Sequence, residues 1–161
     1  MTAVAAWDTT IVSRLRPGSR AALYVQEEAL AGRTVCVPAP VLSEVAYGFA
    51  RRGASLARNL RWFQRLARSP LMCVLAYDRE AGLLAGKLRA LAPQAPAVGR
   101  HDRRTKPERR VSWLLDLQIA ATAYAAGHDV ATDNRRDFEA IAQLLKRDLG
   151  LEPLGVYDPP V

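Results

Sequence analysis

Histidine and cysteine are scarce in this chain of 161 residues, which has two of each. Cys36 and Cys73 lie far apart inside apolar runs, without a CxxC motif or a Cys/His cluster at zinc-ligand spacing. This excludes a disulfide framework and a zinc site, and it predicts two small core thiols in a reduced protein. His101 and His128 fall in polar segments, and their spacing to other polar residues supports no catalytic role.

Long hydrophobic runs are also missing. The first residues, "MTAVAAWDTT", have a short apolar run without a basic start, and Asp8 interrupts it. We therefore expect neither a signal sequence nor a membrane span, and a soluble, cytoplasmic protein. With half of its residues apolar, the chain suits a single domain over residues 1–161.

Acidic residues are fewer than basic ones, 16 against 23, which gives a formal net charge of +7. The planar guanidinium group of arginine can donate two hydrogen bonds to phosphate oxygens, so the excess of arginine favours a polyanionic partner. A genome rich in guanine and cytosine, which favours arginine and alanine codons, explains the charge nearly as well.

Strand and helix patterns alternate along the chain. The segments predicted as strands are apolar and often β-branched, at 3–7, 34–40, 71–77 and 129–133. Helical periodicity covers 10–32 with a break at residues 17–18, and then 41–53, 54–69, 78–91, 113–127 and 136–150. Residues 93–111 form a charged loop insertion without periodicity. The alternation predicts a three-layer α/β/α domain with a central, mostly parallel sheet of four to five strands.

Carboxylates stand at the ends of these predicted elements. Asp8 follows the first strand directly, and an acidic segment at 133–137 follows the fourth. Glu44 and Asp116 lie near the starts of two helices. Sites in parallel sheets form at the carboxyl ends of strands, so all of these side chains can converge there. Taken singly, each is also explained as a helix cap or a first-turn charge.

Taken together, these carboxylates predict a cation site. Glu44 and Asp116 are flanked by apolar residues, unlike most caps. Two carboxylates about 4 Å apart repel by roughly 4 kcal/mol at an effective dielectric near 20, so a cluster takes up either protons or cations. Oxygen ligands without His or Cys indicate Mg²⁺ or Mn²⁺, and a divalent ion beside a basic surface suggests phosphodiester hydrolysis.

Three stretches carry a resemblance to a known family: "WDTTIVSRL", "PAPVLSEVAYGFARR" and "LLDLQIAATAYAAGHDVATDNRRDF". In this order and spacing, which covers most of the chain, they resemble the PIN-domain ribonucleases, specifically the VapC-like toxins of toxin–antitoxin pairs. The resemblance places the three most dependable acids of the family at Asp8, Glu44 and Asp116. It places a hydroxyl that assists the first acid at Thr10.

The fourth acidic position of the family falls on Asn134, an amide. Some relatives with Asn at this position have an acid one turn later, so the resemblance implies Asp137 as the fourth acid, with Asn134 assisting. Asp133 stays open as a solvent-facing or hydrogen-bonding alternative.

The resemblance implies a Mg²⁺- or Mn²⁺-dependent endoribonuclease toxin that cleaves structured or single-stranded RNA, whether tRNA, rRNA or mRNA. Asp8, Asp116 and Asp137 would be metal ligands, and Glu44 a ligand or the group that positions water. The implied partners are a cognate VapB-like antitoxin and a second copy in a homodimer. The basic segment at 100–110 either clamps RNA or has no defined role.

Two alternatives remain at this point. A catalytically silent PIN module would bind RNA or a protein without cleaving, and Asn134 motivates it. An unrelated nucleotide-binding or receiver-like α/β domain would share the alternation of strands and helices. The second is disfavoured, because "DTTIVSRL" after the first strand lacks the glycines of a phosphate-binding turn.

Overall fold

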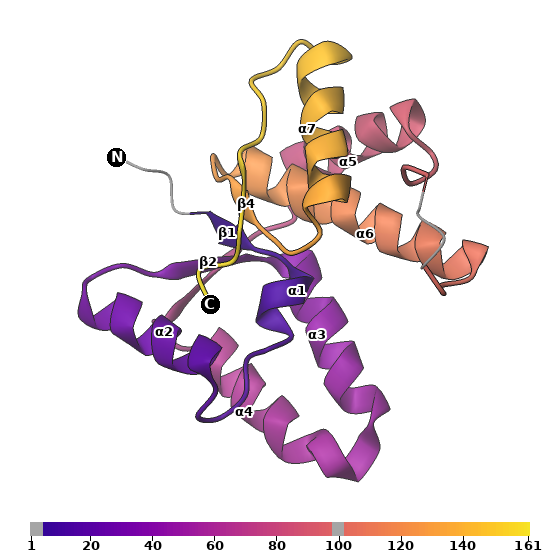
Figure 1. Ribbon diagram of the computed structural model, residues 1–161. Helices are drawn as coiled ribbons and strands as arrows, with labels where there is room; N and C mark the ends of the chain where they lie inside the picture. The colour runs from indigo at the N-terminus through magenta and orange to yellow at the C-terminus, as the bar shows by residue number, and fades with distance from the viewer. Residues whose placement is uncertain (1–4, 98–101) are drawn as a thin grey trace.

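Short strands lie between two groups of helices in the computed structural model, which describes residues 5–97 and 102–161 (Figure 1). Helices α1 to α4 lie on one side of the strands and α5, α6 and α7 on the other. The strands are β1 (Ala6–Trp7), β2 (Val35–Pro38), β3 (Met72–Leu75), β4 (Val130–Ala131) and β5 (Val156–Tyr157). The helices are α1 (Thr9–Val12), α2 (Arg20–Leu30), α3 (Ala39–Arg51), the 3-10 turn η1 (Gly53–Leu56), α4 (Ala57–Ala67), α5 (Arg79–Leu91), α6 (Lys106–Ala125) and α7 (Arg135–Arg147).

All strand pairs are parallel. β4 lies between β1 and β5, and β2 pairs with β3, so the hydrogen bonds define two sheets with β1 packed beside β2. Ala6 is opposite Val130, which brings the carboxyl ends of β1 and β4 together. The α/β architecture with parallel strands is therefore confirmed, although the strands pair in two sheets instead of one.

Strand β5 comes from the proline-rich tail and was not predicted, because a strand of two residues shows no periodicity. It docks through Gly155, whose N–H donates to Asp129 Oδ1 at 2.8 Å. A Cβ atom on Gly155 would lie 2.5 Å from the carboxyl carbon of Asp129, so only glycine allows this approach.

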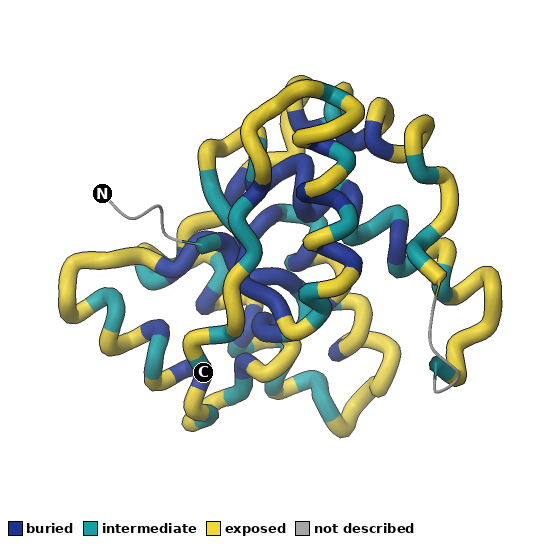
Figure 2. The backbone as a smooth tube through the Cα atoms, turned by 45° about the horizontal axis from the view of Figure 1, so that its top comes forward, coloured by how far each residue is buried: buried dark blue, intermediate teal, exposed yellow. Residues whose placement is uncertain are grey.

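The core fills the space between the strands and the two helix groups, where Figure 2 shows the buried residues in dark blue. Trp113, Leu117, Phe138 and Ile141, from α6 and α7, are among its fully buried side chains. Each such side chain contributes about 1.5–3 kcal/mol when it leaves water. The prediction for the cysteines is right for Cys36, which is buried, and wrong for Cys73, which is exposed on β3, directly opposite it.

Helix α6 begins at Lys106, seven residues before the predicted start. Thr105 and Glu108 form a reciprocal capping box, in which Glu108 N donates to Thr105 Oγ1 and Thr105 N donates to Glu108 Oε2. Residues 106–111 are therefore helical, a correction to the predicted loop at 93–111. The charges of "KPERR" hid the helix because they carry no apolar period. Arg100 and His101 lie outside the described residues.

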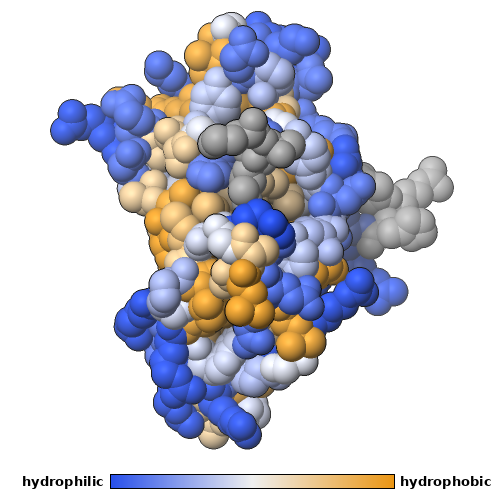
Figure 3. All heavy atoms as spheres, turned by 90° about the vertical axis from the view of Figure 1, so that its left-hand side faces the viewer, coloured by the Kyte–Doolittle hydropathy of each residue, from blue (hydrophilic) through white to orange (hydrophobic). Residues whose placement is uncertain are grey.

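The surface on the left of Figure 1 is mixed in character. Figure 3 shows hydrophobic atoms gathered across its middle, with hydrophilic atoms around them. Leu23 and Leu30 on α2 are among the large apolar side chains that the structure leaves exposed.

Within residues 5–97 and 102–161, none of the helices has the length and apolar character needed to cross a membrane.

Candidate active site at the ends of β1 and β4

Asp8 is both a helix cap and a buried acid. It is 2% exposed, and its Oδ1 accepts hydrogen bonds from Thr10 Oγ1 at 2.6 Å, Thr10 N at 3.0 Å and Ile11 N at 3.4 Å. These bonds start α1, as a capping aspartate does. Its Oδ2 accepts from Thr132 Oγ1 at 2.6 Å. The capping explanation for Asp8 is therefore right, and it does not exclude a place in the site.

Two threonine hydroxyls hold the segments after β1 and β4 together. Thr10 Oγ1 accepts from Asp133 N at 3.1 Å, and Thr132 Oγ1 accepts from Asn134 N at 2.8 Å. Each hydroxyl thus donates to Asp8 and accepts from the backbone after β4. Thr132 was missed from the sequence. Its only signal is a hydroxyl at the end of a predicted strand, beside the acidic segment.

Asn134 connects two further acids. Its Nδ2 donates to Asp116 Oδ2 at 3.0 Å and to Asp137 Oδ2 at 3.1 Å. Asp116 lies in the interior of α6, so the explanation of Asp116 as a helix cap is wrong. Asp137 is buried in the first turn of α7.

The acids carry negative charge that their surroundings compensate poorly. Burial raises the pKa of Asp116 well above its ordinary value, and the charges of Asp137 and Asp8 raise it further. Arg104 and the Asn134 hydrogen bond lower this pKa, with smaller effects. Burial also raises the pKa of Asp8, against the hydrogen bonds from Thr10 and Thr132. Asp8, Asp116 and Asp137 therefore form one electrostatic group.

Glu44 and Asp133 stand apart from this group. Glu44 is exposed on α3 and is not among the charges that shift the pKa of Asp116. It lines a groove with Thr9, the residue after Asp8. Asp133 is exposed and forms an ion pair with Arg14, which matches the solvent-facing alternative.

As the side chains stand, no group of three or more His, Cys, Asp or Glu residues in the described parts of the chain is placed to hold a metal ion. The Asn134 amide nitrogen lies between Asp116 and Asp137 instead. The chemistry of the donors fits Mg²⁺ or Mn²⁺, because carboxylate and amide oxygens are hard ligands, and because burial first and then the charges of Asp137 and Asp8 raise the pKa of Asp116, so that its ionised form lacks a compensating cation. Rotation of the Asn134 amide would exchange its nitrogen for an oxygen ligand.

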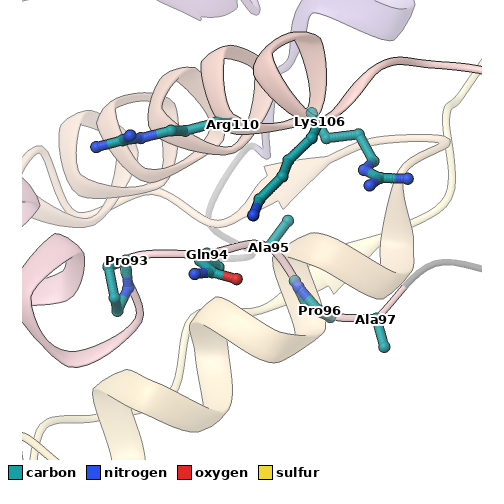
Figure 4. Close-up of a pocket in the computed structure, with 8 residues that line it drawn as sticks. Pro93, Gln94, Ala95, Pro96, Ala97, Lys106 and Arg110 are labelled. Carbon is teal, nitrogen blue, oxygen red and sulfur yellow. The ribbon is translucent and has the colours of Figure 1, made fainter.

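A cavity of about 450 Å³ lies elsewhere, between the segment 93–97 and the first turns of α6. Lys106, Arg109 and Arg110 line it, and Figure 4 shows Lys106 extending from α6 toward Gln94 and Ala95. None of the clustered acids lines it, so its chemistry is that of a basic surface hollow.

Residues 6–144 match the PIN domain family. The chain belongs to this family. PIN domains are generally nucleases and typically use divalent metals, which supports a nuclease here. A comparison with curated proteins finds no match.

Solved structures with a similar fold come from toxin–antitoxin complexes. VapBC2 from Rickettsia felis, bound to a promoter DNA fragment, matches with a TM-score of 0.61 and 18% identity over 94% of this chain and 97% of that chain. FitAcB from Neisseria gonorrhoeae matches with a TM-score of 0.57 and 20% identity over 95% and 96%. DNA-bound VapBC from Salmonella typhimurium matches with a TM-score of 0.54 and 23% identity over 94% and 95%. At these identities the likeness establishes a shared PIN fold.

Proposed function

We propose that this PIN domain is a metal-dependent endoribonuclease toxin of the VapC-like kind, neutralised by a VapB-like antitoxin. The observation that carries the proposal is the electrostatic group of Asp8, Asp116 and Asp137 at the carboxyl ends of β1 and β4. The net charge of +7 supports a polyanionic substrate. The fold shared with VapBC and FitAB proteins supports a toxin.

Asp8, Asp116 and Asp137 would hold Mg²⁺ or Mn²⁺, with Glu44 as a further ligand or as the group that positions water. When bound, the ion would neutralise charge on the phosphodiester and activate water for attack. Thr10 and Thr132 hold Asp8 in place through both of its oxygens. Asn134 holds Asp116 and Asp137 at a fixed separation.

Arg104 supplies positive charge beside the acids. It lowers the pKa of Asp116, and its own pKa is raised first by the hydrogen bond to Asp102 and, with smaller effects, by the charges of Asp137 and Asp116. Its guanidinium is also bound to Asp102, with Nη2 donating to Oδ2 at 2.8 Å. An RNA phosphate that approaches the acids therefore meets a guanidinium that is already positioned.

The antitoxin and a second copy of the chain need apolar surface. A hollow of about 210 Å³ between α2 and α4 is lined by Ala22, Trp62 and Leu66, and Leu23 is exposed on the same α2. Apolar grooves between helices receive amphipathic helices of partners. We therefore propose that the antitoxin docks at this hollow, and that the protein is a homodimer in the cytoplasm.

A silent PIN module that binds RNA or protein is the second candidate. Asn134 favours it, because the amide donates to two acids that would otherwise receive a cation. This candidate predicts that RNA binds without being cut.

Cleavage of a mixed cellular RNA pool tests the proposal. Purified protein with Mg²⁺ or Mn²⁺ should make discrete cuts that disappear with EDTA and in Asp116→Asn. Asp148→Asn, an exposed acid just after α7, is the matched control and should cut normally. Binding of Mn²⁺ by titration calorimetry gives a readout apart from cleavage. If the protein binds RNA without cutting it and also fails to bind Mn²⁺, the nuclease proposal is wrong and the protein is a silent PIN module.

A further inference from the structure

The groove lined by Thr9 and Glu44 lies between α1 and α3, begins at the residue after Asp8 and has a volume of about 360 Å³. Thr9, next to Asp8 in the chain, lines it from α1, and Glu44 lines it from α3. Tyr47, Arg51 and Arg52 continue along the α3 side. The groove therefore runs from an acid of the proposed site to a cluster of arginines.

Positive charge is concentrated in this groove. The Arg16 guanidinium lies 4.6 Å from the centre of the Phe49 ring, and its Nη1 donates to Ser13 O at 2.6 Å. Burial lowers the pKa of Arg16, and the charge of Arg52 lowers it further. The ion pairs found within the described residues involve other arginines. Three arginines, Arg16, Arg51 and Arg52, line the groove against the single carboxylate of Glu44, and this excess of positive charge is the electrostatics of an anion site.

Thr9 provides an independent observation. Its Oγ1 is buried and, among the described residues, is the one such side-chain polar atom without a hydrogen-bond partner. A buried hydroxyl without a partner is costly, and native structures rarely keep one unless a ligand or water completes it. Since Thr9 lines the groove, an oxygen atom that enters the groove can supply the partner.

Tyr47 adds an aromatic face. It is 58% exposed although it belongs to the same groove as the arginines. Aromatic side chains beside a basic track are how proteins hold unpaired nucleotides, with each base stacked on a ring and each phosphate on a cation.

We propose that this groove holds one unpaired nucleotide of the RNA, next to the phosphodiester that the acids cut. Arg16 and Arg52 bind its phosphate, Tyr47 stacks on its base and Thr9 bonds an oxygen of the strand. The inference rests on the proposed function and deepens it, because it makes the substrate a single-stranded segment or a loop.

RNA binding without cleavage tests the inference. The protein is the full chain with Asp116→Asn in EDTA, and the probe is a fluorescently labelled single-stranded oligoribonucleotide followed by anisotropy. Adding Tyr47→Ala should weaken binding about 5- to 150-fold, the loss of one base–aromatic stack, and Tyr47→Phe should restore it. Adding Arg52→Gln should lower the slope of log affinity against log salt by about 0.7.

Matched controls are Tyr77→Ala, an exposed tyrosine after β3, and Arg147→Gln, an exposed arginine at the end of α7; both should bind like the parent. All of these side chains are exposed, so the variants should fold, which thermal melts check.

Three outcomes would overturn the inference. If the parent binds RNA and the groove variants bind it equally well, the groove is not the nucleotide site, and the proposed function stands. If the parent binds no RNA in EDTA, the groove by itself does not hold a nucleotide and the inference fails, whereas the cleavage experiment with Mg²⁺ or Mn²⁺ decides the proposed function separately. If the groove variants no longer bind an acidic, aromatic peptide that the parent binds, but bind RNA as the parent does, the groove receives a protein partner instead.

Discussion

Thr132 donates its hydroxyl hydrogen to Asp8 Oδ2 at 2.6 Å and joins the carboxyl ends of β4 and β1. The same hydroxyl accepts from Asn134 N at 2.8 Å, so one buried side chain aligns residues of both segments. The placement of Asp8 and Asn134 therefore depends on a residue that carries no charge.

Replacement of Thr132 by valine should destabilise the protein by about 1–3 kcal/mol, because it leaves a buried acceptor and a backbone N–H without partners. Chemical denaturation measures this. Thr122→Val is the control: Thr122 is also buried, but its hydroxyl bonds only the Gln118 carbonyl of its own helix at 2.7 Å. We expect a smaller loss there, and equal losses would contradict the role given to Thr132.

Replacement of Asp116 by asparagine should stabilise the protein at neutral pH when no divalent ion is bound. The pKa of Asp116 is raised in the folded state, so folding favours the protonated acid. Its contribution is fully present below the unfolded pKa near 4 and is lost as pH rises through the folded pKa. The melting temperature of Asp116→Asn should exceed that of the parent at pH 7, by about 2–4 °C per kcal/mol of relieved repulsion.

The advantage of Asp116→Asn should shrink as the pH falls toward 4, where the parent acid is protonated in both states. Thermal melts across this range, in EDTA, measure it. An advantage that does not change with pH would show that the ionisation of Asp116 is not its cause. Mg²⁺ or Mn²⁺ should stabilise the parent and leave the variant unchanged.

Replacement of Asn134 by aspartate should strengthen Mn²⁺ binding and weaken the metal-free fold. The change replaces an amide that donates to Asp116 and Asp137 with a carboxylate that repels both. Without metal, the loss of two charge-assisted hydrogen bonds should cost about 3–6 kcal/mol. Titration calorimetry and denaturation measure the two effects. If Mn²⁺ affinity stays at the parent value, position 134 is not beside the cation.

Asp133 and Asp137 should respond differently to the same substitution. Asp137→Asn removes a buried acid of the site and should abolish most metal-dependent cleavage. Asp133→Asn removes only an exposed ion pair with Arg14, worth about 0–1 kcal/mol, and should cleave normally. RNA cleavage by the two variants decides which aspartate fills the fourth acidic position, and loss in Asp133→Asn alone would reverse the assignment.

The two thiols should react at very different rates. Burial, together with the neighbouring Cys73, raises the pKa of the Cys36 thiol to about 11, and Cys73 is exposed. At pH 8 only about one Cys36 thiol in a thousand is then ionised, so iodoacetamide should modify Cys73 first. Mass spectrometry over time follows the reaction. In Cys73→Ser the slow reaction of Cys36 should remain, and rapid labelling there would contradict its burial.

Much of the fold could be predicted because most of its strands and helices have clear local sequence patterns. The runs around β2 and β3 are apolar and β-branched, and Gly32 and Gly127, both at φ +74°, follow α2 and α6 where the helices were expected to end. The start of α6 could not be predicted, because its first turn is charged and is held by the capping box of Thr105 and Glu108. Strand β5 could not be predicted either, because two residues carry no pattern and the strand depends on the contact of Gly155 with Asp129.

By itself the sequence determined the order of β1 to β4 and of the helices that follow them, the parallel pairing that brings Asp8 to the segment after β4, and the acids available there. The periodicity of apolar residues and the rules of parallel sheets are enough for this. Only the tertiary structure decided that Asp133 faces solvent and pairs with Arg14, and that Asn134 joins Asp116 to Asp137. Hydrogen bonds between side chains depend on how α6 and α7 pack against each other, and residue spacing along the chain does not contain that geometry.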